Sequence, residues 1–417
     1  MTVIIAGAGI AGLSLGLSLH QIGVPFRIYE AVQKIGPLGV GINLQPNAVR
    51  ELFDLGLEDA LDSIGVRTQS YGFHTKTGLE IWREPRGTWA GYYWPQFSVH
   101  RGRLQMLLHD TLVSRAGRDC IVTGHRATGF TTQGTGAVLH LAGPDGPTQA
   151  KGSVVIAADG IHSALRTQMY PGEGPPIWGG AILWRGTTRM APFLGGADMA
   201  LAGHDTQRIV TYPISAPDPD TGLATINWIA ELRVDPAQGW RKEDWNRAAK
   251  LADFAPAFAD WRFDWLDVPA MIAAATEVFE YPMVDRDPIP RWTNGAVTLM
   301  GDAAHPTYPV GSNGASQAIV DARQIAAMIR GHGQTPDALI AFESLIRPRM
   351  EKVILANRGS GPDAVLQMVE DRCGGTFDDV EDVIPRAELA AHADRYKALA
   401  GFGVETLNAQ LPILPVV

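Results

Sequence analysis

The chain has 417 residues, 46% of them hydrophobic, and its formal net charge at pH 7 is −9. This length and hydrophobic content provide for two or three domains with a proper core, which excludes a disordered chain. The acidic charge argues against a nucleic-acid partner, because it would repel a phosphate backbone. Cys120 and Cys373 form neither a disulfide framework nor a zinc motif, so we expect no metal site and a reduced, cytoplasmic protein.

The first apolar stretch, residues 3–19, is interrupted by four glycines and no basic residue precedes it. It is also shorter than the ~20 residues that a spanning helix needs. We therefore interpret it as a buried strand followed by the start of a helix, and we expect no membrane partner.

This opening segment carries a nucleotide-binding pattern. Residues 3–6 are β-branched and apolar, the turn at residues 7–12 reads GAGIAG, and an apolar helical pattern follows. In this pattern Gly7 allows the tight turn, Gly9 lets the backbone approach a pyrophosphate, and Gly12 lets helix and strand pack closely. The next strand, residues 26–29, ends at Glu30, where an acid accepts hydrogen bonds from a ribose hydroxyl. The pattern predicts a dinucleotide site but does not separate NAD from FAD.

Two later blocks favour FAD. In the first, an apolar strand at residues 154–157 runs into Asp159 and Gly160. In the second, the strand at residues 297–300 runs into Gly301 and Asp302, and a Gly-rich segment at 309–315 precedes an apolar helix. Glycines at that helix start would bring backbone N–H groups against a flat, electron-rich ring, where the helix N-terminus can stabilise a reduced flavin.

The segment between these blocks predicts a β-sheet. Residues 181–187, 208–214 and 224–230 alternate between apolar and polar side chains, as strands do. With the aromatic-rich residues 71–97 they would form a second domain over the flavin, whose rings favour a planar ligand. The polar candidates for contact with that ligand are Arg185, Tyr212, Asn227 and Tyr281.

His305 follows Gly301 and Asp302 in the same turn. It is a candidate base, although a histidine before a proline is more typical of a structural donor. The end of the chain, residues 359–417, reads as mixed helix, and its apolar, proline-broken tail from Leu411 is expected to pack on the body or on a partner subunit.

These motifs together resemble the single-component flavoprotein aromatic hydroxylases of the para-hydroxybenzoate hydroxylase fold, which share GxGxxG, Asp-Gly and Gly-Asp motifs. Residues 37–46, 100–102, 281–288 and 313–319 are similar to the salicylate hydroxylase branch and, nearer still, to the phenazine-carboxylate hydroxylases. The resemblance covers about residues 1–355. It implies an α/β fold with a Rossmann-like FAD-binding domain, an inserted β-sheet substrate domain and a C-terminal helical segment.

The resemblance also implies domain boundaries and cofactor contacts. The FAD-binding domain would comprise residues 1–70, 98–177 and 283–358, the substrate domain 71–97 and 178–282, and the helical segment 359–417. Glu30 would bind the adenosine ribose, Arg101 and Asp302 would hold the pyrophosphate and ribityl region, and residues 311–315 would face the isoalloxazine. Asp159 belongs to a motif associated with both FAD and the transient nicotinamide donor. The candidate cofactor-binding residues are Gly7, Gly9, Ala11, Gly12, Glu30, Gly41, Arg101, Asp159, Gly301, Asp302, Gly311, Asn313, Gly314 and Ala315.

The function implied is an FAD-dependent monooxygenase. It would hydroxylate an aromatic or heteroaromatic, carboxylated or phenolic small molecule with NADH or NADPH and O2, through a flavin C4a-hydroperoxide. FAD is expected to be non-covalent and the protein a monomer or homodimer. Because the chemistry is centred on the flavin, no catalytic residue is assigned; for an acidic substrate, Arg185 or Tyr212 is the expected anchor.

Two alternatives stay open. The first is a flavin halogenase or a dehydrogenase, but the Trp-x-Trp-x-Ile-Pro run expected of a halogenase is absent from the sequence. The second is a non-catalytic nucleotide-binding module, which would need no ring-facing loop such as residues 311–315.

Overall fold

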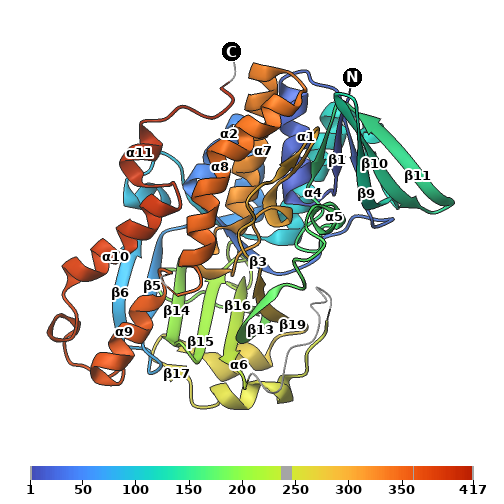
Figure 1. The fold of residues 1–417 in the computed structure, drawn as a ribbon. Helices are drawn as coiled ribbons and strands as arrows, with labels where there is room; N and C mark the ends of the chain where they lie inside the picture. The colour runs from blue at the N-terminus through green and yellow to red at the C-terminus, as the bar shows by residue number, and fades with distance from the viewer. Residues whose placement is uncertain (1, 236–246, 360, 416–417) are drawn as a thin grey trace.

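The computed structural model describes residues 2–235, 247–359 and 361–415. Residues 236–246 of the predicted substrate domain, Ser360 and the last two residues of the apolar tail lie outside the described residues. Within the described part, the chain forms two large sheets with helices packed between and around them (Figure 1).

The first sheet has six strands and a parallel centre. Its order is β20 (Thr293–Asn294), β21 (Val297–Leu299), β12 (Val154–Ala157), β1 (Val3–Ala6), β2 (Phe26–Tyr29) and β8 (Ile121–Val122). All pairs are parallel except β20 with β21. All four residues of β1 and of β12 are buried, as expected for central parallel strands covered on both faces.

Helices cover one face of this sheet, and a small antiparallel sheet packs on the other side. Helix α1 (Ile10–Gln21) packs against α4 (Arg101–Ala116) and α7 (Gly314–His332), and α7 packs against α2 (Pro46–Asp54) and α8 (Pro336–Ala356). Strands β9 (Arg126–Gln133), β10 (Gly136–Gly143) and β11 (Gly146–Gly152) form the small sheet, with β10 against β12 and β11 against β1. The short helices α3 (Glu58–Ile64) and α5 (Ala164–Met169) complete this half of the molecule.

The second large sheet has seven strands and lies below the first in Figure 1. Its order is β19 (Val278–Asp285), β13 (Ile177–Met190), β16 (Ala224–Arg233), β15 (Gln207–Pro213), β14 (Asp198–His204), β5 (Ser70–His74) and β6 (Glu80–Pro85). The three strands predicted from alternation are therefore confirmed as β13, β15 and β16. One face packs on α6 (Val268–Ala273) and the short hairpin β17 (Arg262–Phe263) and β18 (Leu266–Asp267) through an aromatic core that includes Trp184 and Trp228.

A three-stranded sheet connects the two halves. It consists of β3 (Gly41–Leu44), β7 (Gln96–His100) and β4 (Gly65–Thr68). Its strand β7 ends in His100, whose Nδ1 accepts hydrogen bonds from the N–H groups of Gly102 and Arg103 and so starts α4.

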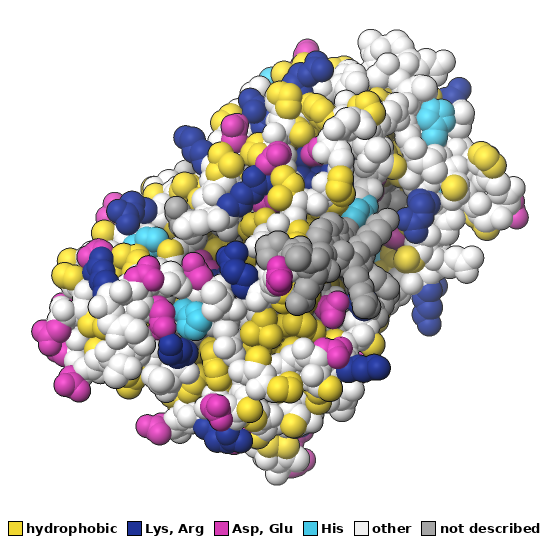
Figure 2. Space-filling view, turned by 60° about the horizontal axis from the view of Figure 1, so that its bottom comes forward, with side chains coloured by type: hydrophobic (Ala, Val, Ile, Leu, Met, Phe, Trp, Pro, Cys, Tyr) yellow, Lys and Arg dark blue, Asp and Glu magenta, His cyan; other side chains and the backbone are white. Residues whose placement is uncertain are grey.

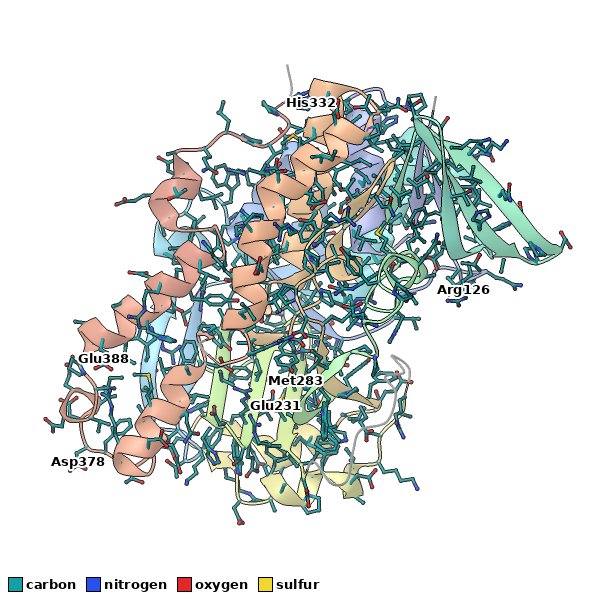
Figure 3. All side chains as sticks on the ribbon, in the orientation of Figure 1. Arg126, Glu231, Met283, His332, Asp378 and Glu388 are labelled. Carbon is teal, nitrogen blue, oxygen red and sulfur yellow. The ribbon has the colours of Figure 1, made fainter. Side chains whose placement is uncertain are left out.

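The C-terminal segment contributes α9 (Ala364–Cys373) and α10 (Arg386–Leu399), which lie beside β5 and β6 (Figure 1), and α11 (Val404–Asn408), whose Asn408 bonds to Gly91 O and Tyr93 N. Its tail packs on the body of the chain, one of the two arrangements expected from the sequence: Leu414 is fully buried and its carbonyl oxygen accepts a hydrogen bond from Arg323. Figure 3 labels Asp378 and Glu388 in the part of this segment that lies farthest from the six-stranded sheet. It also labels Glu231 and Met283 near the centre of the molecule, on the seven-stranded sheet.

Among the described residues, no helix is long and apolar enough to cross a membrane. On the face shown in Figure 2, Lys and Arg side chains are interspersed with Asp and Glu. The two cysteines are free thiols, with Cys120 buried and Cys373 partly exposed.

Candidate active site

The predicted motifs all follow the carboxyl ends of neighbouring parallel strands. The GAGIAG turn follows β1, Glu30 follows β2, Asp159 follows β12, and Gly301 with Asp302 follows β21. Because β21, β12, β1 and β2 are consecutive in the sheet, these motifs share one edge. Ligands of open α/β sheets bind at that edge.

The glycines of the first turn differ in what surrounds them. A Cβ at Gly7 would overlap the carbonyl oxygen of Ala158, and a Cβ at Gly12 would overlap that of Gly7. A Cβ at Gly9 would meet nothing within 4 Å. Gly7 and Gly12 are therefore required for packing, whereas Gly9 leaves open space where a pyrophosphate would approach the start of α1.

The carboxylate of Glu30 binds the backbone of this turn. Its Oε2 accepts a hydrogen bond from Ala8 N at 2.7 Å, and its Oε1 accepts one from Val32 N at 3.0 Å. Each oxygen retains a second lone pair for a ribose hydroxyl. Gln105, which the motif analysis missed, supports the same turn from α4 by donating to Ala8 O at 2.9 Å.

The Gly-Asp turn is held by a carboxylate on α7. Asp321 is fully buried, and its Oδ2 accepts a hydrogen bond from Gly301 N at 2.9 Å and lies 2.6 Å from His305 Nε2. His305 is 3% exposed, so the pair gives it a structural role in fixing this turn. A Cβ at Gly301 would lie 3.3 Å from the Cβ of Ala11, which places the turn directly against the fingerprint helix.

A second buried side chain fixes the same loop. Arg166 of α5 donates from Nη1 to the carbonyl oxygens of Ala303 and Ala304, at 3.2 and 2.8 Å. Its other nitrogens bond to Glu173. The sequence shows Arg166 close after Asp159, but nothing in the motif indicated this contact.

Arg101 and Asp302 influence each other electrostatically. Both side chains are solvent-exposed, yet protein surrounds them closely enough to shift both pKa values. Partial burial lowers the pKa of Arg101, with Asp302 opposing the shift and Arg185 adding to it. Burial raises the pKa of Asp302, with His305 and Arg101 opposing. A cation and an acid with solvent-accessible faces are thus available for phosphate oxygens and sugar hydroxyls respectively.

The Gly-rich loop before α7 has the form of a backbone cradle. Gly311 has a φ of +74°, which favours glycine, and its carbonyl oxygen accepts a hydrogen bond from Gln45 Nε2 at 3.4 Å. A Cβ at Gly314 would meet nothing within 4 Å, and no side chain caps the first turn of α7. The N–H groups of that turn are therefore available to a ligand, as the sequence predicts for residues 311–315.

Three of the polar candidates on the seven-stranded sheet converge on β3. Asn227 Oδ1 accepts a hydrogen bond from Gly41 N at 2.7 Å, and Arg185 Nη2 donates to Gly41 O at 2.8 Å. Tyr212 lies within hydrogen-bonding reach of Arg185 and Asn43. The fourth candidate, Tyr281, presents its ring to the Arg185 guanidinium at 5.7 Å. Arg185, one of the two expected anchors, thus has a partner in the protein itself, and this group joins the seven-stranded sheet to β3.

Buried polar atoms without a protein partner concentrate around this region. They include Asn43 Nδ2, Gln45 Oε1, Arg86 Nε, Asp159 Oδ1, Arg185 Nε, Asn227 Nδ2 and Asn313 Nδ2. Since buried polar groups in native proteins are nearly always hydrogen-bonded, this concentration indicates a ligand site. Together with the open space at Gly9, it fits a dinucleotide that extends from the first turn to the loop before α7.

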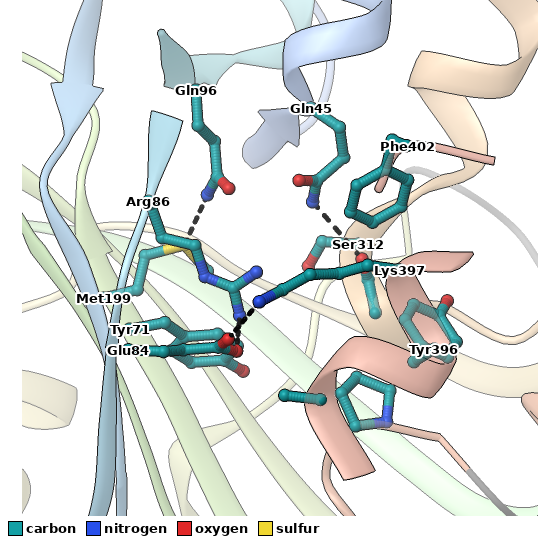
Figure 4. A pocket seen from close by; sticks show the side chains of 13 residues that line it. Gln45, Tyr71, Glu84, Arg86, Gln96, Met199, Ser312, Tyr396, Lys397 and Phe402 are labelled. Atoms are coloured by element: carbon teal, nitrogen blue, oxygen red, sulfur yellow. Dashed lines mark hydrogen bonds and ion pairs between the residues drawn. The ribbon is translucent and has the colours of Figure 1, made fainter. Parts of the chain in front are cut away.

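The aromatic residues of segment 71–97 mostly do not line this site. Phe73 and Tyr92 are buried in hydrophobic cores, while Trp89 and Tyr93 are exposed. Tyr71 alone among them borders the pocket shown in Figure 4. Four of these rings thus lie in hydrophobic cores or on the surface, and Tyr71 is the member of the group that borders this pocket.

Comparisons with known proteins agree with this geometry. The chain matches the family model described as FAD binding domain over residues 1–250 and 267–355. It is 42% identical over 362 residues to a phenazine 1,6-dicarboxylic acid hydroxylase of Lysobacter antibioticus, a match that covers 85% of this chain and 89% of that protein. A 3-amino-4-hydroxybenzoate 2-monooxygenase of Streptomyces cremeus is 31% identical over 360 residues, covering 84% of each. The solved structure of Klebsiella pneumoniae HpxO with FAD and uric acid has a TM-score of 0.72 at 22% identity and covers 98% of this chain and 96% of that one.

The chain therefore belongs to the FAD binding domain family. It is an FAD-dependent monooxygenase of the aromatic hydroxylase class, and the fold class, the cofactor and the family resemblance expected from the sequence are confirmed.

Proposed function

We propose that this monooxygenase hydroxylates an aromatic or heteroaromatic acid, using NADH or NADPH and O2. The observation that carries the proposal is the contact of the β3 region with both the loop before α7 and the seven-stranded sheet. Gln45, directly after β3, bonds to Gly311 and Ser316, and Asn227 and Arg185 bind both backbone groups of Gly41. The two relatives described above have names that specify a ring bearing carboxylate groups. That shared feature supports an acidic ring substrate here.

When bound, FAD supplies the redox chemistry: it takes electrons from the nicotinamide and lets O2 give one oxygen atom to the ring. The chain supplies position and environment. We propose that Gly9 and the α1 N-terminus hold the pyrophosphate, that Glu30 holds the ribose, and that Arg101 and Asp302 hold the segment between pyrophosphate and ring.

The loop at residues 309–315 and strand β3, which Gln45 links by bonds to Gly311 and Ser316, would hold the flavin ring. Above them, an apolar sheet face excludes water, which protects a reactive oxygen species from side reactions. Its members that pack with Tyr308 are Ala181, Leu183, Ile229, Tyr281 and Met283. His305 acts as a positioning residue through Asp321 rather than as a base.

We also propose the domain division 1–70, 98–177 and 283–358 for FAD, 71–97 and 178–282 for substrate, and 359–417 as the helical segment. The seven-stranded sheet supports it, since residues 70–85 and 177–285 supply all seven strands. We further propose a cytoplasmic monomer or homodimer, consistent with two free thiols and a dependence on NAD(P)H.

The test is turnover with candidate aromatic acids, with phenazine-1,6-dicarboxylic acid tried first. Consumption of NAD(P)H and O2 that depends on such an acid, with a hydroxylated product, supports the proposal. Flavin reduction without any oxygenated product would favour the dehydrogenase alternative instead.

A further inference from the structure

A polar pocket lies beside the loop before α7 (Figure 4). Strands β5 and β6 form one wall, the Gly311–Ser312 turn forms a second, and α10 forms a third. Its lining residues are Gln45, Tyr71, Glu84, Arg86, Gln96, Met199, Gly311, Ser312, Pro362, Ala393, Tyr396, Lys397 and Phe402. The pocket thus shares its Gly311 wall with the loop that we assign to the flavin ring.

The charges that face this pocket leave an excess of one positive charge. Arg86 and Lys397 both pair with Glu84, Arg86 through Nη2 and Lys397 through Nζ at 2.9 Å. Burial would raise the pKa of Glu84, but Arg86 and Lys397 outweigh this effect and the pKa is lowered, so the carboxylate stays ionised. Lys397 also reaches Asp394 at 3.4 Å, but the side chain of that acid is 76% exposed and lies at the solvent edge. The buried Arg86 and the partly exposed Lys397 therefore share one buried anion, Glu84.

The pocket also contains hydrogen-bond donors that lack a strong protein acceptor. Arg86 is only 9% exposed, and its Nε has no partner. Gln96 is 2% exposed, and the acceptor of its amide nitrogen is the sulfur of Met199 at 3.3 Å, which is a weak acceptor. A buried guanidinium N–H without an acceptor costs free energy, and an anionic ligand would remove that cost.

Flat and apolar side chains form the remaining walls. The Arg86 guanidinium lies 5.1 Å from the ring centroid of Tyr71, and Tyr396 and Phe402 approach from the C-terminal segment. Burial raises the pKa of both tyrosines, so they stay neutral. The enclosed space of about 20 Å³ takes an acidic group at its cationic end but not a ring, so the ring of such a ligand would lie outside this pocket.

We propose that Arg86 and Lys397 bind the acidic substituent of the aromatic substrate, so that α10 of the C-terminal segment completes the substrate pocket. This inference rests on the proposed function and specifies its substrate contact. It differs from the anchor expected from the sequence, Arg185, which donates from Nη2 to Gly41 O and also has an unpartnered Nε. It also gives residues 359–417 a role in substrate selection.

Calorimetric titration of the FAD-loaded enzyme tests this assignment. The probes are phenazine-1,6-dicarboxylic acid and unsubstituted phenazine, which share the ring and differ in the acidic groups. The variants are Arg86→Gln and Lys397→Met. Matched controls are Arg83→Gln, which changes an arginine on β6 that pairs with Glu80 outside the pocket, and the exposed Lys352→Met. Circular dichroism and flavin content verify that each variant folds.

Each pocket variant should raise the Kd of the dicarboxylic acid at least tenfold and change that of phenazine less than twofold, while the controls change neither. Unchanged acid binding in both pocket variants, or a wild-type protein that does not prefer the acid, would overturn the anchor. Binding that follows the prediction without hydroxylation would contradict the proposed function alone, because titration does not depend on turnover. If Arg86→Gln loses structure, Lys397→Met decides the result by itself.

Discussion

Arg185 of the seven-stranded sheet donates a hydrogen bond of 2.8 Å to the carbonyl oxygen of Gly41, which belongs to the three-stranded sheet that connects the two halves of the molecule. The contact ties the seven-stranded sheet to β3, the strand that we propose faces the cofactor. It therefore sets how closely a substrate on the sheet is held to the flavin, and geometry of this kind controls the efficiency of oxygen transfer.

The first prediction follows from this contact. Arg185→Gln should lower the product formed per NAD(P)H consumed at least twofold and raise peroxide release, with a smaller effect on the rate of flavin reduction. Arg189→Gln, an exposed position on the same strand, is the control. Product and peroxide assays during turnover provide the measurement, and unchanged coupling in Arg185→Gln would remove the positioning role.

The second prediction separates two glycines of the fingerprint. Gly9→Ala should fold normally, because Gly9 has a φ of −73° and an added Cβ meets nothing within 4 Å, but it should bind FAD more weakly. Gly12→Ala should lose roughly 1–3 kcal/mol of folding stability or more, because its Cβ would overlap the Gly7 carbonyl. Thermal unfolding of apoprotein and FAD titration measure the two effects separately. Equal FAD affinity in Gly9→Ala and wild type would contradict the pyrophosphate assignment.

Local sequence predicted the cofactor edge well, and there is a physical reason. Each motif is a strand followed by a turn, and parallel strands bring their carboxyl ends to one edge whatever the loops between them do. Contacts between segments that are far apart in the sequence could not be predicted in the same way. Nothing near Gly301 in sequence indicated that its N–H would bond to Asp321, since that contact depends on how α7 packs.

The aromatic segment at residues 71–97 shows the same limit. Its rings are equally apolar in sequence, but the fold sends Tyr92 into a hydrophobic core and leaves Tyr93 71% exposed. The contribution of Lys397 was also not predictable, because it depends on α10 docking beside β6. Tertiary packing determines whether these side chains are buried and what they contact, and local sequence patterns do not predict it.

The third prediction concerns how the chain retains FAD. Because we expect a non-covalent cofactor, acid precipitation should release the flavin into the supernatant, and apoprotein should rebind it. Asp302→Ala should then raise the Kd for FAD at least tenfold, because the sugar and ribityl hydroxyls lose an acceptor. Asp145→Ala, in the exposed turn between β10 and β11, is the control. Full flavin occupancy in Asp302→Ala would remove its assigned role.

The fourth prediction is a pH dependence of stability. Burial lowers the pKa of His74 from 6.5 to about 4, against the opposing effect of Glu80. The unfolded chain therefore binds the proton more readily than the folded protein. As pH decreases from about 6.5 to about 4, the free energy of unfolding decreases by roughly 3 kcal/mol because of this group.

Urea unfolding of wild type and His74→Phe across this pH range measures the effect. The ring packs on Trp265 with centroids 4.6 Å apart, so phenylalanine keeps the packing and removes the titration. As pH falls, the free energy of unfolding of wild type should decrease relative to that of His74→Phe. A difference that does not change with pH would show that His74 titrates normally in the folded protein.

Incorporation of labelled oxygen tests most directly whether this chain hydroxylates an aromatic acid with O2. Purified holoenzyme is incubated with NADH or NADPH, an aromatic acid such as phenazine-1,6-dicarboxylic acid, and isotopically labelled O2, and the product is analysed by mass spectrometry. We predict substrate-dependent consumption of the nicotinamide and a ring-hydroxylated product that carries one labelled oxygen atom from the gas. Product oxygen that comes from water, or oxidation of the acid without oxygen incorporation, would contradict this prediction.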